Sequence, residues 1–142
     1  DVSPEIISRG MDRIEESLER LVQSHRKTSG KTGLSTAEMK KIRDRLKTST
    51  DLGKLSDRDI AIEAMVEDEE AKKSMIGRLV KAGYDGILTS NTSSISITRL
   101  ASAYPWPERF MGMHFMNPVP VQPGCELIRG LLTSDETSEK VA

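Results

Sequence analysis

The fold is decided by residues 60–66, Ile60-Ala61-Ile62-Glu63-Ala64-Met65-Val66, which form a short and mostly apolar run. A run of this length and composition is typical of a strand that is buried within a parallel sheet. Acidic residues follow at once, from Glu67 to Glu70, and negative charge is favoured at the N-terminus of a helix. The stretch therefore predicts a buried strand that leads directly into a helix.

The rest of the C-terminal half repeats this alternation of strand and helix. Apolar residues recur at helical spacing after the acidic run, and Gly83 stands where such a helix would end. Short runs at 87–90, 110–115 and 126–128 predict further strands, and Ser134 is the expected N-cap of a last helix. Strands that alternate with helices at this spacing predict an α/β fold, in which helices cover the faces of a parallel sheet.

Two helices are predicted in the N-terminal part of the chain. Ser3 is a candidate N-cap that is followed by proline, and apolar residues at helical spacing indicate an amphipathic helix over residues 4–24. Ser35 and Glu38 have the spacing of a capping box, which predicts a second helix over residues 36–46.

Composition excludes several classes of function. The chain of 142 residues has 21 basic and 22 acidic residues, so its charge does not favour nucleic acid or a membrane surface as a partner. Cys125 is the single cysteine, and His25 and His114 lie too far apart for a zinc motif. We therefore expect no structural metal, a small molecule or protein as the partner, and a reducing compartment such as the cytoplasm or an organelle matrix.

Three blocks of sequence carry a resemblance to a known family. They are Ser90-Asn91-Thr92-Ser93-Ser94-Ile95-Ser96-Ile97, His114-Phe115-Met116-Asn117-Pro118-Val119-Pro120-Val121 and Glu126-Leu127-Ile128-Arg129. In this order and spacing they resemble the L-3-hydroxyacyl-CoA dehydrogenases, and most of all the stand-alone 3-hydroxybutyryl-CoA type. The similarity extends over essentially the whole chain.

The resemblance implies a fold and a domain organisation. It implies a Rossmann-like, doubly wound parallel sheet that lacks the family's first strand and Gly-x-Gly-x-x-Gly turn. Residues 1–142 are then expected to be a partial NAD-binding domain, without the helical C-terminal domain through which the family forms homodimers. We therefore expect this polypeptide to be inactive by itself.

The resemblance also implies a reaction, the oxidation of (S)-3-hydroxyacyl-CoA to 3-oxoacyl-CoA with NAD. Such a reaction needs a base for the hydroxyl proton, and His114 is the candidate, with Glu126 as the carboxylate that orients its ring. Ser93 matches the serine that binds the substrate oxygen, and Asn117 matches an active-site asparagine. The alternative for His114 is a buried strand histidine beside an ordinary surface glutamate.

Five residues match positions that bind NAD in the family: Asp1, Ala64, Glu67, Lys72 and Asn91. Asp1 corresponds to the acidic residue that binds the adenosine ribose, and Asn91 to a residue near the nicotinamide ribose. For Glu67 and Lys72 the alternative is that they are charges that cap and solvate the start of a helix.

Ser17 matches a position in the first predicted helix where the family packs the pantetheine arm of the acyl-CoA substrate. The basic residue common two turns later is Ser24 here, although residues 25–27, His-Arg-Lys, follow it directly. The alternative for this basic segment is that it complements the dipole at the end of the helix.

Residues 122–125, Gln-Pro-Gly-Cys, depart from the family, which usually has Met-Lys-Leu-Val before the glutamate. Proline lacks a donor for strand pairing and glycine weakens a strand, so we expect this stretch to disturb the strand that carries Glu126.

Two further hypotheses stay open beside the enzyme fragment. The chain could be a non-catalytic remnant that acts as a binding or interaction module, which the departure at 122–125 favours. It could also belong to a related hydroxyacid dehydrogenase whose substrate carries no CoA, although those relatives depart from the His-Phe-x-Asn-Pro-Val-Pro block.

Overall fold

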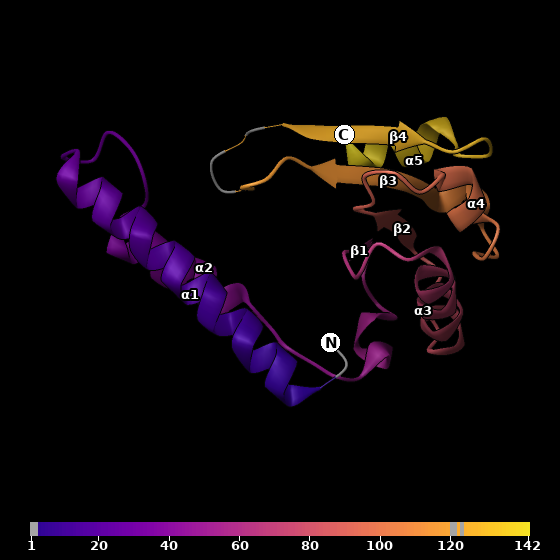
Figure 1. Ribbon diagram of the computed structural model, residues 1–142, viewed down its shortest axis with the longest axis horizontal. Helices are drawn as coiled ribbons and strands as arrows, with labels where there is room; N and C mark the ends of the chain where they lie inside the picture. The colour runs from indigo at the N-terminus through magenta and orange to yellow at the C-terminus, as the bar shows by residue number, and fades with distance from the viewer. Residues whose placement is uncertain (1–2, 120–121, 123) are drawn as a thin grey trace. The chain divides into compact units, whose positions relative to one another are not determined.

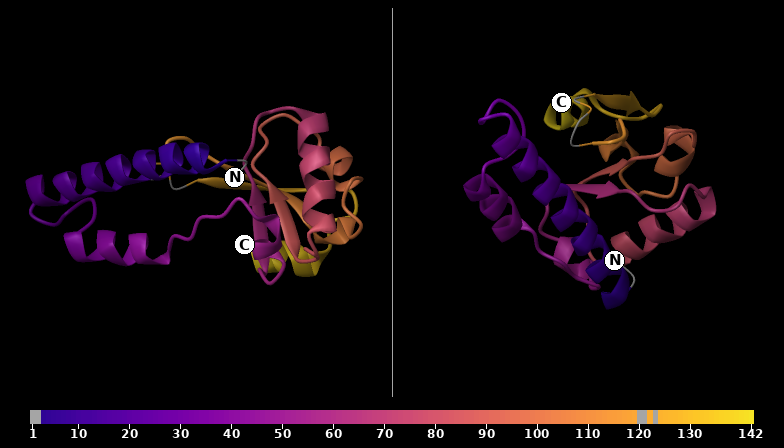
Figure 2. Two further views of the ribbon diagram at one scale, coloured as in Figure 1. Left: turned by 90° about the horizontal axis from the view of Figure 1, so that it is seen from below. Right: turned by 60° about the vertical axis from the view of Figure 1, so that its left-hand side comes forward.

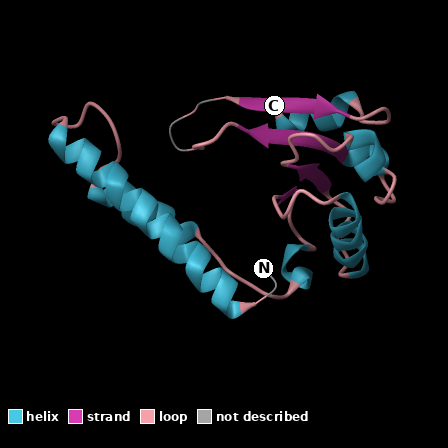
Figure 3. Cartoon of the chain, in the orientation of Figure 1, coloured by secondary structure: helices cyan, strands magenta, loops and turns pink. Residues whose placement is uncertain are grey.

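The computed structural model describes residues 3–119, 122 and 124–142, which form two compact units, Asp1–Asp51 and Leu52–Ala142. The first unit is a pair of helices, α1 (Pro4–Lys27) and α2 (Thr36–Arg45) (Figure 1). The second unit contains four strands, three helices and two short 3-10 turns (Figure 3). Each unit has its own buried apolar residues.

The caps expected for the two N-terminal helices are present. The Ser3 hydroxyl accepts a hydrogen bond from the N–H of Ile6, and Ser35 and Glu38 form a complete capping box. Helix α1 continues to Lys27, one turn beyond the predicted end, where the Thr28 hydroxyl donates to the Ser24 carbonyl at 2.8 Å. The predicted end of α2 is correct to one residue.

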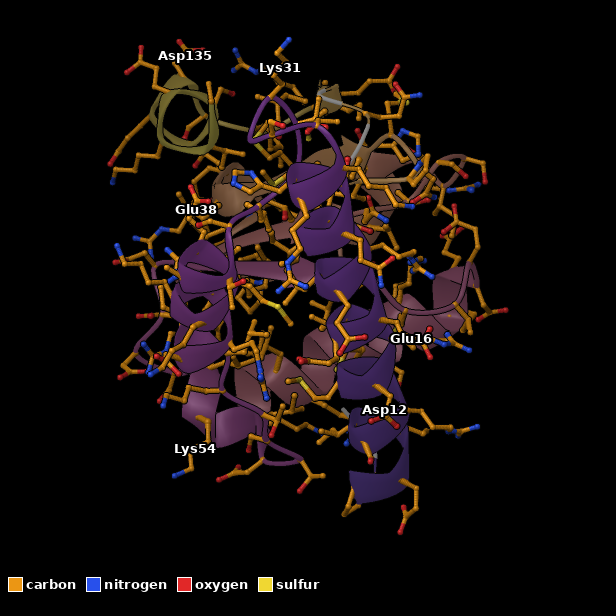
Figure 4. All side chains as sticks on the ribbon, turned by 90° about the vertical axis from the view of Figure 1, so that its left-hand side faces the viewer. Asp12, Glu16, Lys31, Glu38, Lys54 and Asp135 are labelled. Carbon is orange, nitrogen blue, oxygen red and sulfur yellow. The ribbon has the colours of Figure 1, made fainter. Side chains whose placement is uncertain are left out.

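The helix pair is held together by one apolar seam. Leu18 and Val22 of α1 pack against Met39 of α2. The charged side chains of Asp12 and Glu16 lie on the solvent side of α1 (Figure 4). The helices of this unit are therefore amphipathic, as their spacing predicted.

The second unit is built on a sheet with the strand order β1-β2-β3-β4. Its strands are β1 (Ile60–Glu63), β2 (Ile87–Ser90), β3 (Phe110–Phe115) and β4 (Cys125–Arg129). Strands β1, β2 and β3 are parallel, as expected from the helical crossovers between them. The predicted strands at 87–90 and 110–115 have the observed bounds.

Strand β4 is the exception to the predicted parallel sheet, because it pairs antiparallel with β3. A parallel pair needs a crossover of about a dozen residues or more, whereas residues 116–124 join β3 to β4 directly. The resulting α/β fold is Rossmann-like with a mixed sheet.

Helices cover both faces of this sheet (Figure 2). On one face, α3 (Glu69–Lys81) and α4 (Ile97–Ala101) pack on Leu88 and Phe110, which are 1% and 0% exposed. On the other face, Val141 of α5 (Asp135–Val141) packs on Ile87 and Met111. Strand β2, in the middle of the parallel strands, is buried at all four of its residues, and helices on the two faces make the arrangement doubly wound.

Gly124 and Cys125 do not interrupt the strand that carries Glu126. Cys125 pairs with Phe115, and beyond it the N–H of Met116 donates to the carbonyl of Gly124 at 3.2 Å. The expected disturbance is therefore not seen at Gly124 or Cys125. Pro123 lies outside the described residues.

No helix in the described part of the chain has the length and apolar character to cross a bilayer.

Candidate active site

The site is built at the end of β3, where an imidazole faces a carboxylate on the neighbouring strand. His114 and Glu126 are direct partners in the β3–β4 register, so their side chains lie on the same face of the sheet. His114 Nδ1 and Glu126 Oε2 are 2.9 Å apart. Because an ionised carboxylate only accepts, Nδ1 carries the proton in this pair, which leaves the lone pair on Nε2.

A pocket of about 320 Å³ opens beside this pair. It brings Ser93, from the loop after β2, together with His114 and Glu126. In the described part of the chain, neither the Ser93 hydroxyl nor His114 Nε2 has a hydrogen-bond partner. The remaining lining residues are Thr92, Ser94, Ile95, Ser96, Ile97, Thr98, Ile128 and Arg129. The pocket therefore offers a hydroxyl and a basic nitrogen that can both bind one polar ligand group.

A larger cavity, of about 870 Å³, lies at the opposite end of the strands. It is lined by residues that precede the strands, such as Asp59, Gly86 and Arg109. Ligands of open α/β sheets bind at the carboxyl ends of the strands, so the smaller pocket is the candidate site.

Glu67 does not stand free at the start of α3. Its Oε1 oxygen accepts hydrogen bonds from the Thr92 hydroxyl, the N–H of Ser93 at 3.0 Å and both the N–H and the hydroxyl of Ser94 at 3.2 Å. Desolvation disfavours the charged carboxylate, but these hydrogen bonds and the charge of Lys72 outweigh it and lower the pKa of Glu67 to about 2. The helix itself is capped by Asp68, whose side chain accepts from the N–H of Ala71 at 2.7 Å.

Lys72 is a buried cation with carboxylate partners. Its side chain is 1% exposed, and Nζ lies 2.8 Å from Glu63 Oε1 and 3.5 Å from Glu67 Oε2. Glu63, at the end of β1, also accepts a hydrogen bond of 2.5 Å from the hydroxyl of Ser90 at the end of β2. Lys72 is therefore not a solvated charge at a helix start.

The other predicted site residues lie as follows. The side-chain oxygen of Asn91 accepts from the N–H of Phe115 at 2.9 Å, and so joins the end of β2 to the end of β3. Asn117 is exposed after β3, and Ala64 is exposed after β1. Ser17 is half-buried on α1, in the other unit, and Asp1 lies outside the described residues.

Sequence patterns missed Glu63, Ser90 and Thr92 as members of the site. The available signal was Glu63 itself, because an acidic residue inside an apolar strand requires a buried partner. Among the described residues, no group of His, Cys, Asp and Glu has the arrangement of a metal site.

The buried ion pair between Lys72 and Glu63 is expected to stabilise the second unit. Lys72→Met should lower the free energy of unfolding of the second unit by about 3–5 kcal/mol, because it leaves the Glu63 carboxylate buried without a cation. Adding Glu63→Gln should restore part of this loss, since the amide is uncharged and still accepts from Ser90. Urea titration followed by fluorescence of the single tryptophan, Trp106, measures the change in this unit.

Lys73→Met is the matched control for this experiment. Lys73 is the neighbouring lysine, and its side chain is 29% exposed and pairs with Glu69 on the surface of α3. Its replacement should cost less than about 1 kcal/mol. Equal losses for the two lysine variants would show that the Lys72–Glu63 contact is not a buried pair in solution.

The fold and the site define a class of protein. Parallel strands with helices on both faces, and a polar pocket at their carboxyl ends, are features of a nucleotide-binding, Rossmann-like α/β domain. The chain belongs to the family described as "3-hydroxyacyl-CoA dehydrogenase, NAD binding domain", whose model matches residues 1–142. NAD is thus the cofactor of the domain family.

Individual relatives are similar along nearly the whole chain. A probable 3-hydroxybutyryl-CoA dehydrogenase of Deinococcus radiodurans is 43% identical over 99% of this chain and 48% of its own length. The crystal structure of M. tuberculosis FadB2 has a TM-score of 0.90 at 38% identity, over 99% of this chain and 48% of that one. That of the (S)-3-hydroxybutyryl-CoA dehydrogenase PaaH1 from Ralstonia eutropha has a TM-score of 0.89 at 40% identity, with the same coverage. The chain spans about half the length of these relatives.

Proposed function

We propose that this chain provides the proton-accepting part of an NAD-dependent dehydrogenase that oxidises (S)-3-hydroxyacyl-CoA to 3-oxoacyl-CoA. The observation that carries the proposal is the His114–Glu126 pair, 2.9 Å apart, in one pocket with the Ser93 hydroxyl. The names of the relatives support the choice of substrate class.

In the proposed mechanism, His114 removes the proton of the substrate hydroxyl. The free lone pair of Nε2 accepts this proton as the C–O bond becomes a carbonyl, and the Glu126 carboxylate stabilises the imidazolium that forms. The Ser93 hydroxyl donates a hydrogen bond to the same substrate oxygen and so orients it toward His114. Ala64 and Asn91 would lie along bound NAD, whose nicotinamide would supply the acceptor for the hydride on the carbon bearing the hydroxyl group.

The residues at the carboxyl ends of the strands fit a nucleotide. After β1 the backbone turns through Ala64, Met65 and Val66, all of them exposed, and Val66 is 67% exposed. Exposed apolar side chains at this edge suit the face of an aromatic ring. In this proposal Ala64, Glu67, Lys72 and Asn91 lie along the cofactor, and Asp1 binds its ribose.

Ser17 and Asn117 have proposed roles near the substrate, and the chain has a proposed place in a larger protein. Ser17 on α1 would contact the pantetheine arm of the acyl-CoA, and Asn117 would be an active-site asparagine. Residues 1–142 would form part of the NAD-binding domain, with dimer contacts in the helical domain that the family places after it. If the chain were a non-catalytic remnant, a chimaera containing it would form no NADH.

A chimaera tests the proposal. The 142 residues of this chain replace the matching region of the Ralstonia eutropha enzyme, which is 48% of that protein. With NAD and (S)-3-hydroxybutyryl-CoA, we expect the chimaera to form NADH. A folded chimaera that binds NAD and forms no NADH above a heat-inactivated control would refute the proposed function.

The 142-residue polypeptide alone should bind NAD weakly and show no turnover. It contains no Gly-x-Gly-x-x-Gly sequence, and the loss of several backbone donors to phosphate at about 1.5–3 kcal/mol each removes most of the affinity. We expect a Kd of about 1 mM or weaker by calorimetry. A micromolar Kd, or reduction of acetoacetyl-CoA with NADH by the polypeptide alone, would contradict this prediction.

A further inference from the structure

Gly112 lies in the middle of β3, at a point where a larger side chain would have no room. It is two residues from His114, so both residues belong to the same face of the sheet. A Cβ atom at Gly112 would lie 2.9 Å from Cδ1 of Ile97 and 3.0 Å from Cβ of Ile128. A glycine inside a strand often marks the close approach of another part of the chain. Here the approaching residue is Ile97, the first residue of α4.

A second glycine lies against the other branch of Ile97. A Cβ atom at Gly130, directly after β4, would be 3.2 Å from Cγ2 of Ile97. Ile97 is 6% exposed, and a β-branched side chain has few rotamers available. Because both of its branches are in close contact, Ile97 cannot make room for a side chain at Gly112 by rotating. The two glycines therefore hold Ile97 in one place.

Ile97 ends the loop that carries Ser93. Within this loop the Thr92 hydroxyl accepts a hydrogen bond from the N–H of Ile95 at 3.0 Å. Ser93 and Ile97 both line the pocket beside His114. A displacement of Ile97 would therefore move the loop and the Ser93 hydroxyl with it.

Helix α4 is also tied to the strands that carry the other two groups of the site. It lies beside β3, which carries His114, and β4, which carries Glu126 (Figure 1). The Thr98 hydroxyl accepts a hydrogen bond from the N–H of Leu131, after β4, at 3.0 Å. The start of α4 thus joins the loop with the serine hydroxyl to the strands with the base and its carboxylate.

We propose that Ile97 is a positioning residue, and that its seat on Gly112 fixes the loop with Ser93 at the distance from the imidazole that the reaction needs. The inference rests on the proposed function for its catalytic consequence. The side chain of Ile97 is apolar, so its part in the reaction is to hold the polar groups of the pocket in place.

The kinetic test uses the chimaera with Gly112→Ala. The added methyl group should displace Ile97 and lower kcat by about 10 to 100-fold, since a misplacement of about 1 Å can cost about 10²-fold. Adding Ile97→Val removes Cδ1, the nearest atom, and conserves the total volume, so the double variant should recover at least about 5-fold in kcat. The Kd for NAD should stay within about 3-fold in both variants. A double variant no faster than Gly112→Ala would overturn the proposal.

Gly77→Ala is the matched control for the added methyl group. Gly77 lies on α3 in the same unit, and a Cβ atom there would have no heavy atom within 4 Å. We expect its kcat and its Kd for NAD to equal those of the unchanged chimaera. A fall in kcat equal to that of Gly112→Ala would overturn the proposal.

Ile97→Ala is a second variant that adds no atoms and so cannot overpack the core. It removes the branches that contact the two glycines, and kcat should fall at least about 10-fold because the loop is released. Ile76→Ala is its control, since Ile76 is 1% exposed in the same apolar cluster but does not line the pocket beside His114. Equal falls in kcat for these two variants, or no fall for Ile97→Ala, would overturn the proposal.

Amide hydrogen exchange provides a readout that does not depend on activity. In the 142-residue chain, Gly112→Ala should accelerate exchange of the Leu131 N–H at least about 10-fold, because its acceptor on Thr98 moves with the start of α4. The N–H of Ile87 is the internal control, since it donates to the Asp59 carbonyl at 3.0 Å and should stay protected. Unchanged exchange at Leu131 would overturn the proposal.

Ser93→Ala separates positioning from general damage to the fold. If Ile97 acts through Ser93, Gly112→Ala should change kcat by less than about 3-fold in a chimaera that already carries Ser93→Ala. An equal fall in kcat with and without Ser93→Ala would overturn the proposal.

The same variants distinguish failure of this inference from failure of the proposed function. If Ser93→Ala leaves kcat unchanged, the role proposed for Ser93 in the reaction fails, and the catalytic consequence assigned to Ile97 fails with it. An unchanged chimaera that forms no NADH would refute the proposed function, whereas the exchange experiment would still decide whether Gly112 holds Ile97 in place.

Discussion

His114→Gln in the chimaera is expected to lower kcat by about 10² to 10⁴-fold, the range that is typical of a lost general base. Glutamine is close to histidine in size and still forms hydrogen bonds, but it has no nitrogen that can take a proton at neutral pH. The substrate hydroxyl would then lose its proton only to water. The Kd for NAD should be nearly unchanged, because the contacts of His114 lie between β3 and β4.

The measurement is the steady-state rate of NADH formation together with calorimetry for NAD. Ser74→Ala provides a control, since Ser74 is exposed on α3 and does not line the pocket beside His114. A His114→Gln chimaera within about 3-fold of the unchanged kcat would exclude His114 as the base.

Glu126→Gln should lower kcat by about 10 to 10⁴-fold, the larger value being the loss seen when the carboxylate partner of a catalytic histidine becomes an amide. The amide can still accept from Nδ1, but it lacks the negative charge that stabilises the imidazolium after proton transfer. Glu136→Gln is the control, because that exposed carboxylate on α5 pairs with Lys140 and does not line the pocket beside His114, so its replacement should not affect kcat.

The double variant tests whether the two residues act as a unit. His114→Gln with Glu126→Gln should be within about 3-fold of His114→Gln alone, since the carboxylate has no role once the imidazole is gone. If the factors by which the two single substitutions lower kcat multiply in the double variant, Glu126 acts on the substrate or the fold independently of His114.

Most elements of the fold could be predicted because their signals are local. The cap at Ser3, the capping box at Ser35 and the apolar runs of β2 and β3 depend on neighbouring residues. Helix α4 was not predicted, because its five residues are too few for a clear helical period. The direction of β4 was predicted wrongly, because it depends on the length of the connection from β3 and not on the strand's own residues.

Fewer contacts of the site than elements of the fold could be predicted from the sequence. The pairing of His114 with Glu126 was expected from the resemblance, and the β3–β4 register places the two residues opposite each other. The partners of Glu67 could not be predicted, because Thr92 and Ser93 are 25 and 26 positions away in the chain. Contacts of this kind depend on how the ends of two strands meet, which no local pattern specifies.

The central claim is that His114 accepts the hydroxyl proton, and the most direct test is the rate of hydride transfer in single-turnover experiments. The chimaera is mixed with saturating NAD and (S)-3-hydroxybutyryl-CoA, with and without His114→Gln, and the variant is measured again with imidazole added to the solution. We expect His114→Gln to slow hydride transfer by about 10² to 10⁴-fold, and we expect imidazole to restore part of the lost rate because it supplies a base for the hydroxyl proton. Rates within about 3-fold for the two chimaeras, or a slow variant that imidazole does not accelerate, would contradict the claim.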